Sequence, residues 1–344
     1  MNSTHKAEEK KVRERYCSAF LIMLAALLFV TFISFGIGYY PLTPAQIVHA
    51  FASRLGYQGD VLPQAIIIFW NIRLPRIIAA ILIGASLSVA GATYQGMFRN
   101  PLVSPDILGV SSGASLGAAI AILYGSPNWL IQLAAFLGGI IAVALSYLIS
   151  RKSTHSQILS LVLTGSMIMA LCNAGVTMLK YIASPSDLLP QITFWLMGSL
   201  ARVRINDIGL SAVPMILGLT ILFVLRWRIN LLTMDEDEAK SLGINIKRYR
   251  LIFITVSTML SAAAICLGGL IGWVGLMVPH MARTLIGANY KQLIPACGII
   301  GAIYLLIMDN IARSVLSLEL PLGVVVSVMG APFFVFLIIK RRER

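Results

Sequence analysis

Charged residues are scarce in this sequence: they make up 12% of its 344 residues, about half the share found in an average soluble domain. Hydrophobic residues make up 58%, and apolar runs of about 18 or more residues recur from one end to the other. Each such run can cross the apolar core of a bilayer, which is about 30 Å thick. The sequence therefore predicts an all-α, polytopic membrane protein, with residues 1–344 forming a single transmembrane domain.

Cysteine and histidine are also sparse, with four of each. Cys17, Cys172, Cys266 and Cys297 are widely spaced and form no CxxC pair. The histidines are just as scattered, so the sequence favours neither a disulfide framework nor a metal site. We expect the cysteines to be small packing residues, and we expect this chain to bind no cofactor or metal of its own.

Carboxylates are nearly absent from the apolar runs. Among the fourteen Asp and Glu residues, Asp309 alone lies well inside such a run. A secondary transporter driven by protons or sodium usually needs carboxylates inside the bilayer, so this alternative is disfavoured. A membrane-embedded enzyme is a third possibility, and the sequence shows no Ser-His-Asp, HExxH or paired-carboxylate pattern for it. The chain also has no Walker A motif, so we expect it to hydrolyse no ATP itself.

The apolar runs predict about ten membrane-spanning helices. A basic leader, residues 1–18, precedes the first of them. A cleaved signal peptide is the competing interpretation, but the run is too long and no small-x-small cleavage site follows. The eighth span is short enough for a partial crossing. The expected spans are 19–39, 72–97, 109–125, 129–149, 158–181, 207–226, 251–269, 274–286, 292–313 and 321–339.

Lysine and arginine are distributed unequally between the two sides of these spans. Of the 27 basic residues, 20 fall on one side and seven on the other. The positive-inside rule places the basic side in the cytoplasm, and an even number of crossings puts both termini there. The net charge of +13 is thus spread over loops that flank the membrane, so we expect lipid and not nucleic acid as its partner.

Two arginines oppose this trend. Arg73 and Arg76, in the motif "RLPR", lie on the less basic, outer side. One interpretation is that they anchor the helix to lipid phosphates by snorkelling; the other is that they have a task on that side. Asp309 stands four residues before Arg313, so these two side chains can pair on one helix face.

The longest polar insertion, residues 226–250, mixes both charge signs. Acidic residues precede a short helical pattern, Gly243 is a plausible helix stop, and a basic cluster follows. A solvated loop is one interpretation. The ordered pattern favours a compact cytoplasmic helix pair over residues 235–247, suited to docking on a soluble partner.

Small residues in several of the expected spans indicate close packing of helices. Small residues recur at four-residue spacing, which permits close helix contact. The pairs are Gly84 with Ser88, Ala92 with Gly96, and Gly113 with Gly117.

In "RNPLVSPDILGVSSGAS", Pro101 and Pro105 interrupt the apolar pattern on the expected cytoplasmic side. Irregular backbone there is tolerated where it lines a cavity, so this stretch is a candidate for closing a pathway.

The fifth span offers polar and thioether side chains that are candidates for lining the pathway. Apolar packing explains its methionines equally well. The candidates are Thr164, Ser166, Met167, Met169 and Asn173.

Several blocks, in order, resemble the FecCD family, the membrane permeases of bacterial ABC importers for ferric siderophores, haem and cobalamin. The resemblance extends over nearly the whole chain after residue 20. The blocks are "RLPR" (73–76), "GASLSVAGATYQGMFRNPLVSPDILGVSSGAS" (84–115), "EAKSLGINI" (238–246), "GLIGWVGLMVPHMAR" (269–283) and "LPLGVVVSVMGAPFFVFLI" (320–338).

The resemblance implies a type II ABC importer permease in a bacterial or archaeal cell (inner) membrane, with spans 2–5 and 7–10 as inverted repeats. It also implies a homodimer, or a pair of different permeases, around a central pathway. Two cytoplasmic ATPase subunits would use the ATP, and a periplasmic or lipid-anchored binding protein would deliver the cargo. An iron–siderophore or haem-type chelate is the expected cargo; cobalamin and a molybdate-type oxyanion are the alternatives.

The resemblance also assigns residues. In the cobalamin permease of this family, the arginines of the motif and one near the end of the ninth span meet glutamates of the binding protein; the matching residues are Arg73, Arg76 and Arg313. Asp309 is a rival partner for Arg313 within the chain. The cytoplasmic gate matches Asn100 and Leu102, and the ATPase-coupling residues match Glu238, Ala239, Ser241, Leu242 and Gly243.

Overall fold

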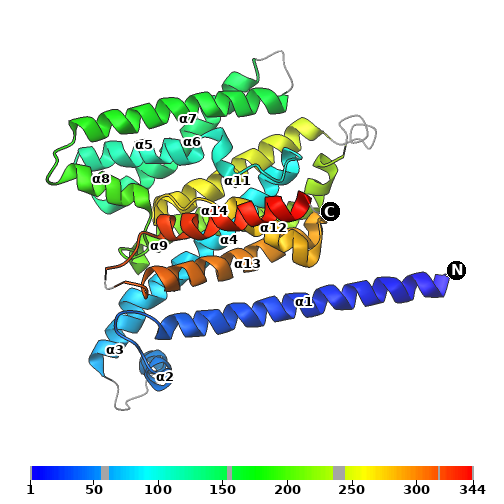
Figure 1. The fold of residues 1–344 in the computed structure, drawn as a ribbon, viewed down its shortest axis with the longest axis horizontal. Coiled ribbons are helices and arrows are strands. Elements are labelled where there is room, and N and C mark those ends of the chain that lie inside the picture. The colour runs from blue at the N-terminus through cyan, green and yellow to red at the C-terminus, as the bar shows by residue number, and fades with distance from the viewer. Residues whose placement is uncertain (1, 56–61, 153–156, 235–244, 317, 343–344) are drawn as a thin grey trace.

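The computed structural model describes residues 2–55, 62–152, 157–234, 245–316 and 318–342. Throughout these ranges the regular elements are helical, and a helix lies at each expected span (Figure 1). These helices are α1 (Asn2–Gly36), α4 (Leu74–Met97), α5 (Val110–Leu123), α6 (Asn128–Ser150), α7 (Gln157–Ile182), α9 (Ile205–Leu232), α11 (Ile246–Gly268), α12 (Val274–Ile286), α13 (Tyr290–Ala312) and α14 (Leu322–Arg342). The expectation of an all-α membrane protein is confirmed.

Not all of these helices have the length of a full span. Seven helical segments of the described chain are long and apolar enough to cross a membrane, and α5, α12 and the apolar part of α14, Leu322–Val335, are shorter. Only α12 was expected to be short. Helix α5 begins one residue after its expected start, directly behind a separate 3-10 turn, Pro105–Leu108, which Gly109 at φ 87° ends. A left-handed residue of this kind favours glycine.

Short elements that the sequence did not reveal lie beside the motif "RLPR". They are α2 (Pro44–Ala52), a 3-10 turn (Ser53–Leu55), α3 (Pro63–Ile67) and a π-helical turn (Ile68–Arg73). A further short helix, α8 (Leu188–Met197), precedes α9. Helix α2 begins with a capping box in which Thr43 and Gln46 exchange hydrogen bonds, a signal that was present in the sequence.

The helices form a bundle with α4 at its centre. Helix α4 packs against α13, α11, α12 and α9, whereas α1 lies along α13, and α7 packs against α5 and α6. Figure 1 shows α1 and α7 on opposite flanks, and both chain termini at the same end of the bundle. This arrangement agrees with an even number of crossings. The other end, which holds α2, α3 and residues 73–76, is called the RLPR end below.

Glycines allow the central helices to approach closely. A Cβ atom added to Gly84 of α4 would lie 2.2 Å from the carbonyl oxygen of Gly301 in α13. Ser88, one turn after Gly84, donates a 2.7 Å hydrogen bond to the carbonyl oxygen of Cys297. A Cβ atom added to Gly113 of α5 would lie 2.4 Å from the carbonyl oxygen of Gly138 in α6. The interpretation of the small-residue pairs as packing positions is therefore confirmed at these contacts.

This close approach predicts a position-dependent cost for one methyl group. In Gly301→Ala, the new Cβ would lie 2.2 Å from Ser88 Oγ and 2.3 Å from the carbonyl oxygen of Gly84. We expect overpacking to lower the free energy of unfolding by about 1–3 kcal/mol, measured as a fall in the thermal midpoint in detergent. The control is Gly298→Ala on the same helix, whose nearest neighbour atom would be 3.7 Å away. Equal midpoints for the two variants would contradict the interpretation.

Candidate functional site

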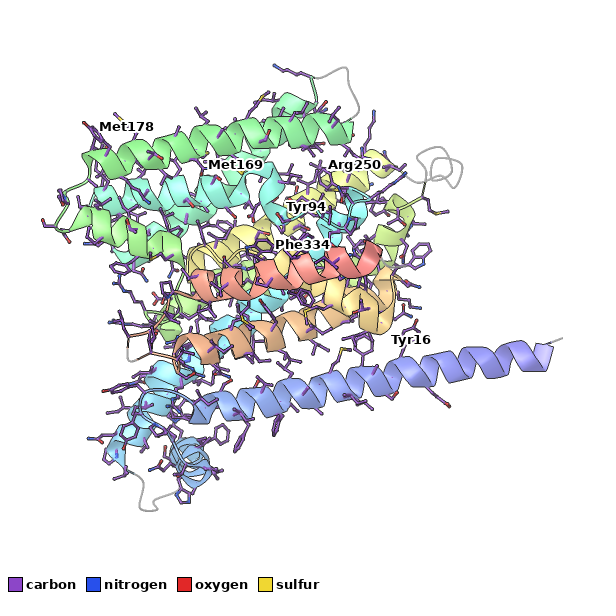
Figure 2. All side chains as sticks on the ribbon, viewed as in Figure 1. Tyr16, Tyr94, Met169, Met178, Arg250 and Phe334 are labelled. Carbon is purple, nitrogen blue, oxygen red and sulfur yellow. The ribbon has the colours of Figure 1, made fainter. Side chains whose placement is uncertain are left out.

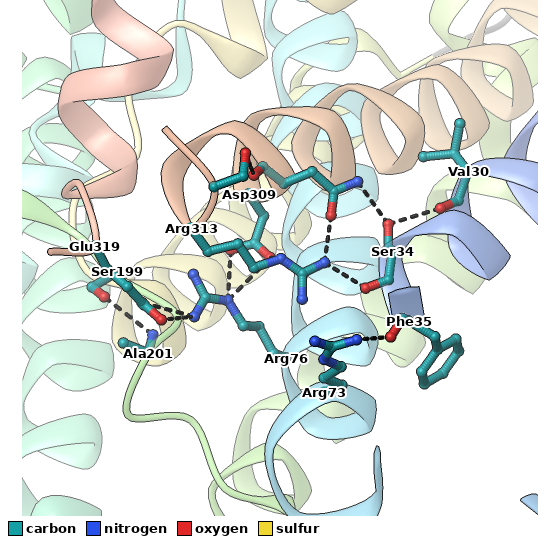
Figure 3. A network of polar contacts seen from close by, with 12 residues as sticks. Val30, Ser34, Phe35, Arg73, Arg76, Ser199, Ala201, Asp309, Arg313 and Glu319 are labelled. Carbon is teal, nitrogen blue, oxygen red and sulfur yellow. Dashed lines mark hydrogen bonds and ion pairs between the residues drawn. The ribbon is translucent and has the colours of Figure 1, made fainter. Parts of the chain in front are cut away.

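The two motif arginines lie in one cluster of charged side chains at the RLPR end (Figure 3). Arg73 ends the π-helical turn, and Arg76 follows in the first turn of α4, where Pro75 suits the start of a helix. Asp309 lies in the last turn of α13, with Arg313 directly after the helix. Glu319 stands in the connection to α14. These five side chains are called the RLPR cluster below.

Arg76 is held between two carboxylates. Its Nε donates to Oδ1 and Oδ2 of Asp309 at 2.8 and 3.0 Å, and its Nη1 donates to both carboxylate oxygens of Glu319 at 2.9 and 2.8 Å. Asp309 is fully buried, whereas the Glu319 side chain is 44% exposed. Charge-assisted hydrogen bonds of this kind fix orientation as well as adding energy, so Arg76 has a defined position.

Arg313 joins α13 to the first helix. Its Nε lies 3.6 Å from Oδ2 of Asp309, an ion-pair distance across one helical turn but longer than a hydrogen bond. The expected pairing of Asp309 with Arg313 is thus confirmed. Its Nη2 donates to the carbonyl oxygen of Ser34 at 2.7 Å and also to Oδ1 of Asn310. Asn310 in turn donates to the Ser34 hydroxyl at 2.9 Å.

Arg73 also acts on the end of α1. Its guanidinium donates to the carbonyl oxygens of Phe35 and Tyr40. Helix α1 ends at Gly36, and the last carbonyls of a helix have no partners within it. Arg73 and Arg313 satisfy those of Phe35 and Ser34, and their positive charges also suit the negative end of the helix dipole. Two of the three arginines assigned to docking therefore cap α1.

Burial separates the arginines from a direct approach by another protein. Arg73, Arg76 and Arg313 are 3%, 5% and 6% exposed. The surface above them is formed in part by Glu319, and its neighbours Val315, Leu316 and Leu318 are exposed apolar residues. The docking assignment stays a prediction. If it holds, a partner must reach Arg76 by moving Glu319.

The expected gate residues lie at the other end of α4. Asn100 and Leu102 form a tight turn in which Asn100 Oδ1 accepts a 2.9 Å hydrogen bond from the Leu102 backbone, and the Leu102 side chain is 59% exposed. Arg99 beside them donates to the carbonyl oxygen of Leu232, at the end of α9. In the 3-10 turn that follows, burial raises the pKa of Asp106, and a hydrogen bond from the Ser111 hydroxyl opposes this shift.

The candidate pathway residues do not all share one side of α7. Ser166, Met167 and Asn173 are exposed and Met169 is half-buried, whereas the Thr164 hydroxyl donates to the carbonyl oxygen of Ser146 in α6. Figure 2 shows α7 at the edge of the bundle, with Met169 and Met178 labelled. The five predicted ATPase-coupling residues lie outside the described residues, as does most of the segment 235–247. They are Glu238, Ala239, Ser241, Leu242 and Gly243.

Comparison with known proteins identifies the chain. The model of the FecCD transport family matches residues 26–340. The chain belongs to this family. The resemblance drawn from its sequence blocks is thereby confirmed, and with it the assignment to the permease subunits of ABC importers, which are transport components and not catalysts.

Three relatives show how broad the family's cargoes are. The molybdate import system permease protein MolB of Haemophilus influenzae is 40% identical over 94% of this chain and 96% of its own length. A probable iron chelatin transport system permease protein of Helicobacter pylori is 40% identical over 83% of this chain and 86% of its own. The hemin transport system permease protein HmuU of Yersinia pestis is 39% identical over 80% of this chain and 84% of its own.

A solved structure supports the same fold. It is described as an inward-facing conformation of an ABC transporter that is presumed to be of the metal-chelate type, and it superimposes with a TM-score of 0.84 at 38% identity. The match covers 93% of this chain and 98% of the other. The chain is therefore a multi-pass membrane permease.

The geometry of the RLPR cluster predicts unequal roles for its two carboxylates. Asp309→Asn removes the charge between two buried guanidinium groups, so we expect a loss of about 3–5 kcal/mol in the free energy of unfolding. Glu319→Gln removes a half-exposed partner, for which about 0–1 kcal/mol is expected. Thermal unfolding of the two purified variants measures the difference, and similar losses in both would show that Asp309 has no special role.

Proposed function

We propose that this chain is the membrane-spanning subunit of an ATP-driven importer that moves a metal chelate, of the ferric siderophore or haem type, into the cytoplasm. The observation that carries this proposal is the match, over 93% of the chain, to a transporter presumed to be of the metal-chelate type. The relatives named for iron chelatin and hemin support the same class of cargo. The chain's own role is to provide the pathway.

The exposed side of α7 suits such a cargo. Between Gln157 and Lys180 the helix has no charged residue, and its exposed positions combine apolar side chains with Ser166, Met167 and Asn173. A bulky chelate can pass such a surface without being held by strong charge pairs. A second copy of the chain would supply the opposite wall, and Asn100 and Leu102 would close the pathway at the cytoplasmic end.

A molybdate-type oxyanion is the second candidate, because MolB is 40% identical over 94% of the chain. The uncharged helix face is as compatible with this small anion as with a chelate. Cobalamin, named for a relative in Halobacterium salinarum that is 36% identical, is a third. Cargo choice in this proposal rests first with the binding protein, which would release its ligand at the RLPR end.

The partners follow the same plan. Two ATPase subunits would bind the segment 235–247 on the cytoplasmic side, where both termini would also lie, and they would use the ATP. A periplasmic or lipid-anchored binding protein would dock at the opposite end of the bundle. The apolar residues Val315, Leu316 and Leu318, which are 60%, 55% and 81% exposed, suit a protein contact there.

Arg76 is the arginine best placed for docking. Arg73 and Arg313 are occupied by the end of α1, whereas one of the two partners of Arg76 is the half-exposed Glu319. The RLPR cluster contains three guanidinium groups and two carboxylates, so it has one positive charge in excess. We infer that a carboxylate of the binding protein takes the place of Glu319 on Arg76.

Uptake measurements test the proposed cargo. The chain is produced together with its ATPase and binding-protein partners, in a host that lacks its own importers for the four cargoes. Labelled ferric siderophore, haem, molybdate and cobalamin are then offered. We expect accumulation of the siderophore or haem that needs ATP and survives collapse of the proton gradient. Uptake of molybdate or cobalamin alone would show that the proposed cargo is wrong. Uptake that a protonophore abolishes while ATP is intact would contradict the assignment to an ATP-driven importer.

Docking of that binding protein tests the role of Arg76. Glu319→Gln removes the competing carboxylate and should tighten docking by up to about fivefold, the equivalent of about 1 kcal/mol. Arg76→Gln should weaken docking by about 30-fold or more, because a buried charge pair would be lost. Arg54→Gln, which alters an exposed arginine stacked on Trp70, is the control. Binding is measured with folded protein in nanodiscs; weaker docking of Glu319→Gln would show that Glu319 itself contacts the partner.

A further inference from the structure

A groove of about 430 Å³ runs between α6 and α9 near the RLPR end. Its position is separate from the RLPR cluster and from the exposed side of α7. The residues that line it are Gln132, Leu133 and Phe136 of α6, Gly209, Leu210, Ser211, Val213 and Pro214 of α9, and Cys266 of α11. Apart from Gln132, Ser211 and Cys266, these side chains are apolar or absent.

The packing of the helices explains the groove. Helices α6 and α9 each pack against α11, so α11 forms the floor between two walls. At the mouth, Asn128 Nδ2 donates a 3.0 Å hydrogen bond to Asp207 Oδ1 and joins the walls. Beyond this bond, Gly209 has no side chain to fill the space, and a Cβ atom there would meet nothing within 4 Å.

Two polar groups in the walls can bind a ligand. Gln132 lines the groove and is 5% exposed. Its side-chain amide makes no hydrogen bond to another described residue, and its atoms are not closed off from the groove. Pro214 lies inside α9 and has no N–H, so the carbonyl oxygen of Leu210 lacks its usual helical donor. A ligand with a hydrogen-bond acceptor would give the Gln132 amide the partner that it lacks within the chain.

The depth of the groove points to a lipid. Gln132 is four residues after the start of α6 at Asn128, roughly 6 Å along the helix axis. The polar interface of a bilayer is roughly 5–8 Å thick on each side, so the amide lies near the level of the ester groups. Leu210 and Val213 are 49% and 68% exposed and open the groove toward the hydrocarbon.

The surroundings of the mouth fit the head of such a lipid. Trp129 lies one turn before Leu133, at the start of α6. It is 59% exposed, as is typical of aromatic side chains at a membrane interface. Arg202 and Arg204 are exposed directly before α9. Together with the carboxylate of Asp207 at the mouth, they leave one net positive charge, which suits the phosphate of a phospholipid.

We propose that this groove binds one acyl chain of a phospholipid from the leaflet at the RLPR end, with a lipid ester oxygen accepting a hydrogen bond from the Gln132 amide. The phosphate is held beside Arg202 and Arg204. The bound chain fills the space between α6 and α9 and so supports both helices against α11. The proposal does not depend on the cargo of the importer.

Native mass spectrometry of the full-length permease tests this proposal, with palmitoyl-oleoyl phosphatidylglycerol as the probe. Gly209→Phe places a ring in open space within the groove, and we expect it to retain one lipid fewer per chain than the unaltered protein. Leu217→Phe is the matched control, because Leu217 is exposed on the same helix, outside the groove. Gln132→Leu should weaken lipid retention by about two- to tenfold, the loss of one net hydrogen bond.

A photoactivatable phosphatidylglycerol with a diazirine on its acyl chain then locates the lipid. We expect crosslinks to the groove segments of α6 and α9, absent in Gly209→Phe and kept in Leu217→Phe. Equal lipid retention by the two folded Phe variants would overturn the proposal. It would also be overturned if a second copy of the chain covered the groove and kept the lipid probe from crosslinking there. Diacylglycerol, which lacks the phosphate, should bind more weakly; equal retention would overturn the role of the arginines.

Discussion

The buried carboxylate of Asp309 balances the charges on which the RLPR end of the bundle depends. It lies within ion-pairing distance of Arg76 on one side and Arg313 on the other. Burying a guanidinium group costs several kcal/mol unless a counter-charge and hydrogen bonds replace the lost water. Through Arg313, Asp309 is linked to the carbonyl end of α1, and through Arg76 to Glu319 before α14. One carboxylate thus connects α1, α4, α13 and the approach to α14.

The cluster gives a physical reason for arginines on the less basic side of the membrane. Arg73 and Arg313 satisfy carbonyls that the end of α1 would otherwise leave without partners. Arg76 is buried, and its contact nearest the outer surface is the half-exposed Glu319. A partner that moved Glu319 would act on the segment just before Leu322, the first residue of α14. The backbone N–H of Leu322 donates to the carbonyl oxygen of Gly198, which follows α8. Docking and the position of α14 would in this way share one connection.

The spans were predictable because length and apolar content alone identify a membrane helix. The pairing of Asp309 with Arg313 was predictable because both lie one turn apart on a helix. The contacts of the other two arginines were not: Arg73 meets Phe35 across 38 residues, and Arg76 meets Glu319 across 243. No local pattern reports such contacts. The family motif identified the positions of these arginines but gave no sign of their burial, and α8 was hidden within a loop.

A double-mutant cycle between Arg76→Met and Asp309→Asn tests the central role of Asp309 most directly. Thermal or denaturant unfolding of the unaltered chain, the two single variants and the double variant gives the coupling free energy of the pair. Since both groups are buried and hydrogen-bonded, we expect a coupling of at least about 1.5 kcal/mol. The double variant should lose much less stability than the sum of the single losses. Additive losses, within about 0.5 kcal/mol, would contradict the account.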